Sequence, residues 1–212
     1  MATEKTKLDR RSFIRNSFLA GGGLLIGFNW LTSACSSGTS NGLTMPDDWS
    51  EINGYLKIGE NGVVTIMAPN PEIGQNVKTS MPMIVAEELD VDWKNVIVEQ
   101  APLNTEVFKR QVAGGSQSIR QSWSALRTAG ATARKMLMEA TAKEWQVPVE
   151  EITTEYGVIY HKKSSKKAGY GEMATGASQL PVPKDVKLKD VKDFKIIGTS
   201  RKNVDGHKIV TG

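Results

Sequence analysis

Alternating hydrophobic and polar residues mark two pairs of short strands along the chain. Residues 54–58 and 63–67 alternate in this way and flank the segment 59–62, which contains Asn-Gly, a strong signal for a hairpin turn. Residues 152–154 and 158–160 form a similar pair around the tripeptide Glu-Tyr-Gly. We therefore predict two β-hairpins.

A helical spacing of apolar residues follows the first hairpin. Residues 69–76 contain prolines and a glycine and predict an irregular loop. The next apolar residues recur at helical intervals and predict one face of a helix: Val77, Met81, Ile84, Val85 and Leu89. Pro82 within this pattern predicts either a kink or a helix whose first turn includes it. The helix should end at 90–93, and the apolar run 96–98 predicts a buried strand.

The longest predicted helix begins after the tight loop 114–118, where a serine is expected to cap it. The preceding residues 101–113 show no periodicity and predict irregular structure. Residues on one face of the helix recur at three- and four-residue steps: Trp123, Leu126, Gly130, Ala133, Leu137, Ala140 and Glu144. The small side chains of Gly130 and Ala133 predict close packing against a sheet or another helix.

Residues 170–178 predict a short helix, and the amino-acid composition changes after it. Residues 181–212 read as a connector rich in lysine and aspartate, with one predicted strand at 194–198. The predicted fold class is α+β, with two helices packed on short hairpins and strands. The predicted domain segment is 53–180, preceded by a flexible tether over 35–52 that is rich in Ser, Gly, Thr and Asn.

Composition narrows the function classes. The net charge of the 212 residues is +4, and the positive residues lie mainly in the first fifteen positions and between Lys162 and Lys208. This distribution predicts an export signal and a solvated tail. It argues against nucleic-acid binding, because no basic stripe is interleaved with stacking aromatic residues.

Metal-ligating residues are scarce. Cys35 is the only cysteine, which excludes an intrachain disulfide and a cysteine-ligated zinc or iron–sulfur site within this chain. His161 and His207 lie far apart, and we predict that both are exposed. We predict no metal ligands here, and any electron-transfer cluster must reside on a partner.

Residues 1–34 have the features of an export signal. Arg10 and Arg11 are followed by Phe13, as in the twin-arginine signal, and a glycine-broken apolar stretch over 18–31 is too short for a span of about 20 residues. The alternative is a basic, membrane-anchoring amphipathic segment. The first interpretation predicts a substrate of the twin-arginine translocase that resides in the periplasm.

Cys35 allows two processing outcomes. Small residues before Ala34 permit ordinary cleavage of the signal peptide after Ala34. Cys35 followed by Ser-Ser-Gly is instead typical of the cysteine that accepts the lipid in a lipoprotein. We favour lipidation of Cys35, although Leu31 lies one position too early for the usual motif. A lipid would anchor the protein to the membrane surface on the periplasmic side.

Two glycine-containing loops, 69–76 and 114–118, each open a predicted helix, where free backbone amides and the positive helix end favour anionic groups. Gln75 can donate and accept hydrogen bonds, so it is suited to a pterin edge or a metal-bound oxygen. Arg120 follows the second loop and can hold a phosphate. By themselves such loops are better explained as turns and helix caps alone, because glycine-rich helix entrances are common. Neither matches a P-loop or a dinucleotide-binding fingerprint.

Both loops resemble segments of the molybdenum-binding subunits of the xanthine dehydrogenase family. The resemblance rests on Pro-Glu-Ile-Gly-Gln-Asn at 71–76 with Ile-Val-Ala-Glu-Glu-Leu at 84–89, and on Gly-Gly-Ser-Gln-Ser-Ile-Arg at 114–120. An arginine-pair signal stands before these motifs in the chain. This order of signal and motifs is similar to that in the large subunit of isoquinoline 1-oxidoreductase and in related periplasmic aldehyde dehydrogenases. Residues 205–212 are similar to the entry into the family's next domain, the hammerhead.

The resemblance implies a site for molybdopterin cytosine dinucleotide. The implied cofactor-binding residues are Gly74, Gln75, Gly115, Ser116, Gln117 and Ser118. Asn76 replaces the family's usual glycine. Because asparagine tolerates a left-handed backbone better than most residues, we expect the turn to survive.

The family hydroxylates an electron-poor carbon of an N-heterocycle or aldehyde with oxygen from water. The resemblance therefore implies an iron–sulfur partner subunit as the electron acceptor, with a c-type cytochrome as a further candidate. The family's general base is a carboxylate near the far end of its large subunit, and no residue here matches it. Glu87 and Glu88 are predicted to be helix-surface carboxylates, so no catalytic residue is assigned.

Two other interpretations remain open. The chain could be a small envelope lipoprotein that binds a ligand or partner without redox chemistry. It could also be a degenerate fragment of a truncated gene. The leading interpretation predicts that the chain is incomplete, with a hammerhead domain after Gly212.

Overall fold

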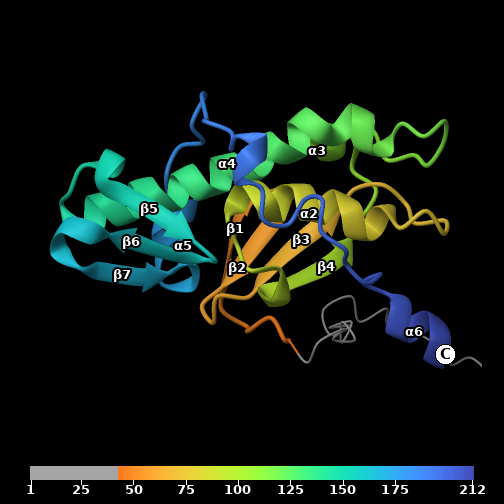
Figure 1. Ribbon diagram of the computed structural model, residues 1–212, viewed down its shortest axis with the longest axis horizontal. Helices are drawn as coiled ribbons and strands as arrows, with labels where there is room; N and C mark the ends of the chain where they lie inside the picture. The colour runs from red at the N-terminus through yellow and green to blue at the C-terminus, as the bar shows by residue number, and fades with distance from the viewer. Residues whose placement is uncertain (1–42) are drawn as a thin grey trace, which may run out of the picture. The chain divides into compact units, whose positions relative to one another are not determined.

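A four-stranded sheet and two long helices form the centre of the structure, a computed structural model that describes residues 43–212. Strands β1 (Trp49–Asn53), β2 (Leu56–Gly59) and β3 (Val64–Ala68) are antiparallel neighbours. Strand β4 (Val96–Gln100) pairs in parallel with β3 (Figure 1). The hairpin expected near residue 60 is confirmed as β2–β3.

Helix α2 (Val77–Leu89) supplies the crossover that the parallel β3–β4 pair requires. It begins after an irregular loop and ends at Asp90, which has a left-handed backbone, as the apolar spacing predicted. Pro82 lies inside the helix beyond its first turn. In the strand β4 that follows, Val96 is buried while Ile97 and Val98 are half-buried, so the prediction of a buried strand is confirmed only in part.

A second sheet contains β5 (Ile152–Glu155), β6 (Val158–His161) and β7 (Lys166–Gly169), all antiparallel. This confirms the second predicted hairpin and adds one strand to it. Helix α5 (Tyr170–Ser178) occupies the residues expected to be helical. Its Tyr170 is fully buried and donates a hydrogen bond to the Leu89 carbonyl, 2.7 Å away, which links this part to α2.

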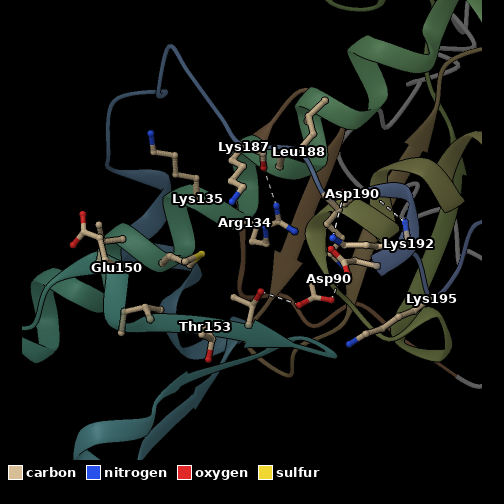
Figure 2. Close-up of a pocket in the computed structure, with 17 residues that line it drawn as sticks. Asp90, Arg134, Lys135, Glu150, Thr153, Lys187, Leu188, Asp190, Lys192 and Lys195 are labelled. Carbon is tan, nitrogen blue, oxygen red and sulfur yellow. Dashed lines mark hydrogen bonds and ion pairs between the residues drawn. The ribbon is translucent and has the colours of Figure 1, made fainter.

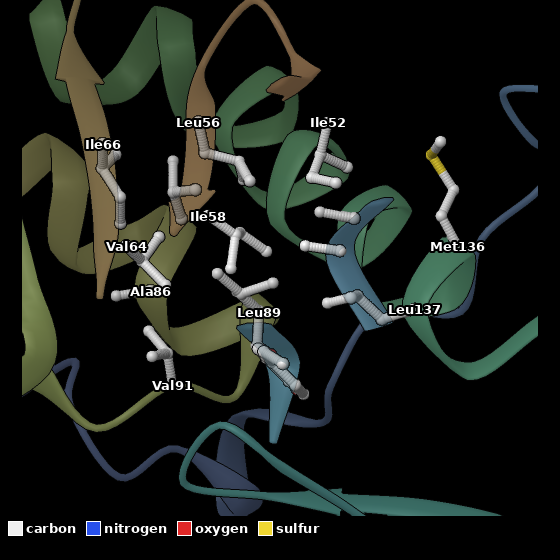
Figure 3. Close-up of a cluster of buried hydrophobic side chains, with 14 of the residues drawn as sticks. Ile52, Leu56, Ile58, Val64, Ile66, Ala86, Leu89, Val91, Met136 and Leu137 are labelled. Carbon is white, nitrogen blue, oxygen red and sulfur yellow. The ribbon is translucent and has the colours of Figure 1, made fainter. Parts of the chain in front are cut away.

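Helix α4 (Ser118–Trp145) packs along α2, and their closest approach depends on Gly130. A Cβ atom on Gly130 would lie 2.3 Å from the Val85 carbonyl oxygen, so the two backbones are in direct contact. The buried cluster in Figure 3 brings together residues from the sheet and both helices: Leu56, Ile58, Val64, Ile66, Ala86, Leu89 and Leu137. The α+β class is confirmed, and the close packing predicted from small residues is confirmed.

Short elements complete the described part of the chain. They are α3 (Thr105–Phe108), α6 (Gly206–Thr211) and the 3-10 turns η1 (Trp93–Asn95), η2 (Val149–Glu151), η3 (Lys162–Ser164) and η4 (Val191–Asp193). Helix α3 interrupts a stretch that was expected to be irregular. Within residues 43–212, no helix is both long and apolar enough to cross a bilayer.

The tether prediction is too long at its C-terminal end. Residues 49–52 belong to β1, and residues 49–51 pair with β2, so the sheet starts before the expected boundary at residue 53. The remainder of the tether up to residue 42, the signal at 1–34 and Cys35 lie outside the described residues.

The prediction for Glu87 and Glu88 is wrong, because both side chains are fully buried. One oxygen of Glu87 accepts three successive backbone N–H groups, from Lys195 at 2.9 Å, Ile196 at 2.6 Å and Ile197 at 3.0 Å. Glu88 forms an ion pair with Arg127, with the atoms 2.6 Å apart. Buried carboxylates need such partners, and these hold the connector against α2 and α4.

Two other expectations are wrong, and a third holds only in part. Residues 194–198 are not a strand, because their amides bind Glu87 and not a neighbouring strand. The connector is exposed along most of its length, as expected, but it is held to the core, since Lys189 contacts the buried Asp90 at 2.6 Å. His161 is buried, between Glu151 at 2.8 Å and Ser164 at 2.6 Å, whereas His207 is exposed as expected.

Candidate functional site

Two loops, 70–76 and 112–118, lie together at one end of the helix pair, because α2 and α4 run in the same direction. Asn70, just before α2, contacts Ser118 at the start of α4, while Glu88 near the end of α2 pairs with Arg127 further along α4. Figure 1 shows both loops at the right-hand end of the view. The N-terminal, positive ends of two helix dipoles therefore point to the same region.

Asn70 is the direct link between the loops. Its side-chain nitrogen donates to the Val112 carbonyl at 3.1 Å and to the Ser118 hydroxyl oxygen at 2.9 Å. The residue is fully buried, and within the described residues its side-chain oxygen has no hydrogen-bond partner. Sequence analysis missed Asn70, because its partners lie more than forty residues away along the chain, at Val112 and Ser118.

The carboxylate of Glu72 binds the backbone amides of the 70–76 loop and of the start of α2. The expectation that these amides are free is therefore wrong. Glu72 accepts from the backbone N–H groups of Gly74 and Asn76, each at 2.8 Å, and of Lys78 at 3.0 Å. Sequence analysis also missed this role of Glu72, although an acidic residue just before a helix is a usable signal. The α2 end therefore presents few free donors to a ligand.

The predicted site residues of this loop lie at its exposed tip. Gln75 folds back on the loop, with its oxygen accepting from the Ile73 amide at 2.7 Å and its nitrogen donating to the Pro71 carbonyl at 3.1 Å. Gly74 has φ +101° and Asn76 has φ 60°, so the left-handed turn expected at Asn76 is confirmed. The side chain of Gln75 retains one N–H for a ligand.

In the 112–118 loop, by contrast, no carboxylate of the described residues binds the backbone amides at the start of the helix. Gly115 (φ +61°) and Ser116 (φ +53°) are successive left-handed residues that turn the chain into α4. Gln117 precedes the helix and accepts from the Arg120 guanidinium at 2.5 and 3.1 Å. The predicted cap at Ser118 is wrong, because Gln117 occupies the N-cap position and Ser118 is the first helical residue.

Free donors gather at the start of α4. Within the described residues, the backbone N–H groups of Ser118, Ile119 and Arg120 have no recorded acceptor, as is usual for the first turn of a helix. The Arg120 side chain is on the same turn and is exposed. This end of α4 has the character of an anion-binding site.

A hollow of 470 Å³ lies beside the 70–76 loop, at the ends of β3 and β4. Its lining includes Glu72, Gln100, Gln111 and the ion pair of Lys78 with Asp205, whose atoms are 2.7 Å apart. Gln111 donates to the Pro69 carbonyl at 3.2 Å and so braces the base of the loop. The hollow adds polar side chains next to the predicted site.

A larger hollow of 840 Å³ lies between α4, β5 and the connector. Figure 2 shows the residues that line it. Several of its cations are already engaged: Arg134 donates to the Lys187 carbonyl at 3.0 Å, and Lys189 pairs with Asp90. Its lining carries both charge signs and none of the predicted site residues. We assign the candidate site to the two loops, where the chemistry converges, and not to the larger hollow.

No group of three or more His, Cys, Asp or Glu side chains suited to hold a metal ion occurs among residues 43–212. Glu87 and Glu88 are enclosed in ion pairs and backbone hydrogen bonds, which leaves them unavailable as general bases.

The carboxylate of Glu72 makes the stability of the 70–76 loop depend on pH. Burial raises the pKa of Glu72, but hydrogen bonds from the N–H groups of Lys78, Asn76, Gly74 and Gln75 lower it by more, so its pKa lies below the usual value. A carboxyl whose pKa is lower in the folded state stabilises the fold fully above the unfolded-state pKa. This stabilisation is lost as the pH falls through the folded-state pKa.

We expect Glu72→Gln to lower the free energy of unfolding at pH 7 by about 1 kcal/mol, since solvent screens this half-exposed group. The difference from the wild type should shrink as the pH falls through the folded-state pKa, as measured by thermal unfolding between pH 7 and pH 3. Glu60→Gln is the control, because Glu60 is exposed. A difference for Glu72→Gln that is constant at all pH values would contradict the role given to this carboxylate.

Comparison with known proteins gives a family match and several similar proteins. A family model described as molybdopterin cofactor-binding domain matches residues 2–209. The chain is 37% identical over 135 residues to the beta subunit of isoquinoline 1-oxidoreductase from Brevundimonas diminuta, a match that covers 61% of this chain and 17% of that protein. It is 28% identical over 193 residues to the B subunit of nicotinate dehydrogenase from Pseudomonas putida, covering 90% of this chain and 16% of that protein.

A third relative is the membrane-bound aldehyde dehydrogenase (pyrroloquinoline-quinone) of Gluconacetobacter polyoxogenes, 24% identical over 202 residues, or 93% of this chain and 26% of that protein. Among solved structures, quinoline 2-oxidoreductase from Pseudomonas putida 86 is similar with a TM-score of 0.44 and 18% identity, over 59% of this chain and 16% of that chain. The chain thus spans between 16% and 26% of the lengths of the three relatives.

Proposed function

Because the chain belongs to the molybdopterin cofactor-binding domain family, we propose that it supplies part of the cofactor site of a molybdenum-dependent oxidoreductase. In this proposal the 70–76 and 112–118 loops hold molybdopterin cytosine dinucleotide. The main support for this proposal is that the Asn70 side chain joins the two loops by hydrogen bonds. The two segments that resemble the family motifs are far apart in sequence, yet they are adjacent in space.

The residues at the two loops suit such a ligand. Free amides at the start of α4 and the Arg120 guanidinium fit the phosphate oxygens of a dinucleotide. Gln75, Gly115 and Ser116 are exposed and Gln117 is half-buried, so a ligand can approach both loops. When bound, the molybdenum cofactor would accept the two electrons removed from the substrate, and these residues would bind and orient it.

We further propose that the substrate is an N-heterocycle or an aldehyde and that electrons leave through an iron–sulfur partner subunit. The names of the relatives support this class, since they include an isoquinoline oxidoreductase, a nicotinate dehydrogenase and an aldehyde dehydrogenase. A c-type cytochrome is a candidate acceptor beyond that subunit. Export to the periplasm by the twin-arginine route, with Cys35 as lipid anchor, belongs to the same proposal.

The test is a chemical analysis of the complete native protein, purified with its partner subunits from cells that make the molybdenum cofactor. We expect molybdenum close to one atom per chain and a cytosine nucleotide released by acid. Pyrroloquinoline quinone without molybdenum, as the name of one relative suggests, would instead reject the proposed cofactor. Absence of both groups from the exported protein would favour a binding protein without redox chemistry.

Gln75→Ala in that protein should reduce the molybdenum retained, or the turnover of the loaded enzyme, because it removes the loop's exposed carboxamide. We expect a loss of about tenfold, the usual effect of removing one hydrogen bond to a charged or strongly polar group. Gln179→Ala is the matched control, since Gln179 is exposed at the end of α5. Full molybdenum content and full turnover in Gln75→Ala would remove Gln75 from the site.

A further inference from the structure

A separate cavity of 530 Å³ lies between η1, the start of β4 and residues 200–207 of the connector. Its lining combines apolar and cationic side chains, which include Trp93, Val96, Val204, Arg201 and Lys202. Among the described residues that line it there is no aspartate or glutamate, and none belongs to the two loops of the candidate site. The cavity therefore has apolar walls and a positive charge, and its volume is usual for a small-molecule site.

Arg201 has a buried hydrogen-bond donor without a partner. Its Nε atom is one of four buried side-chain nitrogen or oxygen atoms among the described residues that have no hydrogen-bond partner. The other three are oxygens, so Arg201 supplies the one donor and the one charged group of this set. A buried N–H group without an acceptor is costly, and the guanidinium group keeps its charge in proteins. Arg201 is therefore suited to an anion that enters the cavity.

The two nearby carboxylates have other partners. Asp92 accepts a hydrogen bond from the Lys94 backbone N–H group at 3.1 Å, and its other oxygen lies 2.9 Å from the Lys94 ammonium. Burial raises the pKa of Asp92, but the hydrogen bonds and charge of Lys94, together with the charge of Arg201, lower it by more. Asp205 pairs with Lys78 at 2.7 Å and lines the hollow of 470 Å³ instead. Neither carboxylate has a recorded ion pair with Arg201.

Hydrogen bonds fix the connector next to Arg201. The Val204 backbone N–H group donates to the hydroxyl oxygen of Thr79, a buried residue of α2, at 3.1 Å. The Asp205 backbone N–H group donates to the Asn203 side-chain oxygen at 2.8 Å. A wall that is already held in place loses little conformational entropy when a ligand binds.

We propose that this cavity binds a small organic carboxylate that carries a flat, apolar ring. The two oxygens of a carboxylate match the planar guanidinium group of Arg201, and Lys202 adds a second positive charge. Trp93 and Val96 supply an apolar wall on which the ring can pack. This site goes beyond the proposed cofactor site and shares no lining residue with its two loops.

The test is a calorimetric titration of the complete native protein with sodium benzoate. We expect Arg201→Met to weaken benzoate binding about tenfold, because a hydrogen bond to a charged group is lost. Arg201→Lys should have a smaller effect, since the ammonium group keeps the charge but not the planar fork. Benzamide, which has the shape of benzoate without its charge, and acetate, which lacks the ring, should each bind about tenfold more weakly than benzoate.

Lys208→Met is the matched control, because it removes one positive charge from an exposed residue of α6 that does not line the cavity. It should bind benzoate like the wild type, and weakening equal to that of Arg201→Met would reduce the effect to general charge attraction and overturn the site. Arg201→Met should keep the unfolding temperature and molybdenum content of the wild type. A lower unfolding temperature together with lost binding would assign Arg201 a structural role instead.

Undiminished benzoate binding in Arg201→Met would place the ligand elsewhere and overturn the proposal. The absence of benzoate binding to the wild type would do the same, and equally tight binding of benzamide or acetate would overturn the proposed ligand class. A wild-type protein that binds benzoate through Arg201 but contains no molybdenum would reject the proposed function and leave this site standing.

Discussion

Glu87→Ala is expected to lower the free energy of unfolding by about 3–5 kcal/mol, because it breaks a buried, charged hydrogen-bond network. The substitution removes the acceptor of the N–H groups of Lys195, Ile196 and Ile197, and one partner of Lys189. Each donor left buried without a partner costs about 1–3 kcal/mol. Urea denaturation followed by circular dichroism measures the loss, and amide hydrogen exchange at 195–197 locates it.

Two variants control for this result. Glu60→Ala removes an exposed carboxylate on the β2–β3 turn and should change stability by less than about 0.5 kcal/mol. Glu87→Gln keeps an oxygen that can accept from the three amides while it removes the charge, so its effect should lie between the two. If Glu87→Ala unfolds like the wild type and 195–197 remain protected, the buried network does not hold the connector.

Gly130→Ala is expected to destabilise the protein by about 1–3 kcal/mol, the range for an overpacked core. In an isolated helix the same change would stabilise by about 1 kcal/mol, since alanine is the better helix former. The sign is reversed here because the new Cβ would lie 2.3 Å from the Val85 carbonyl oxygen, 2.9 Å from the Glu88 Cβ and 3.1 Å from the Leu89 nitrogen. Two of these three atoms are backbone, so α2 and α4 must move apart.

Gly176→Ala in α5 is the matched helical control. Its Cβ would meet only the Ala140 Cβ, at an ordinary 3.8 Å, so we expect no loss and a gain of up to about 1 kcal/mol. Thermal unfolding of both variants against the wild type measures the contrast. Equal stabilisation by the two alanines would show that the helices do not touch at Gly130. Separation of the helices should also reduce cofactor retention, because α2 and α4 carry the two loops.

Local periodicity predicted most of the secondary structure. The apolar spacing located α2 and α4, and the alternating runs with their turn residues located the β2–β3 and β5–β6 hairpins. These signals depend on neighbouring residues and on which face is buried, which a sequence displays directly. The predicted strand at 194–198 failed because its amides bind a side chain more than a hundred residues earlier, at Glu87.

The sequence by itself determined the α+β class, the two loops that open helices and, through their motifs, the resemblance to a molybdenum-binding family. Only the tertiary structure decided which of the two loops has free donors, because Glu72 closes one while Asn70 joins it to the other. It alone also decided that Glu87, Glu88 and His161 are buried. The physical reason is that a polar side chain can be buried only where partners satisfy it, and those partners come from distant parts of the chain that packing brings together.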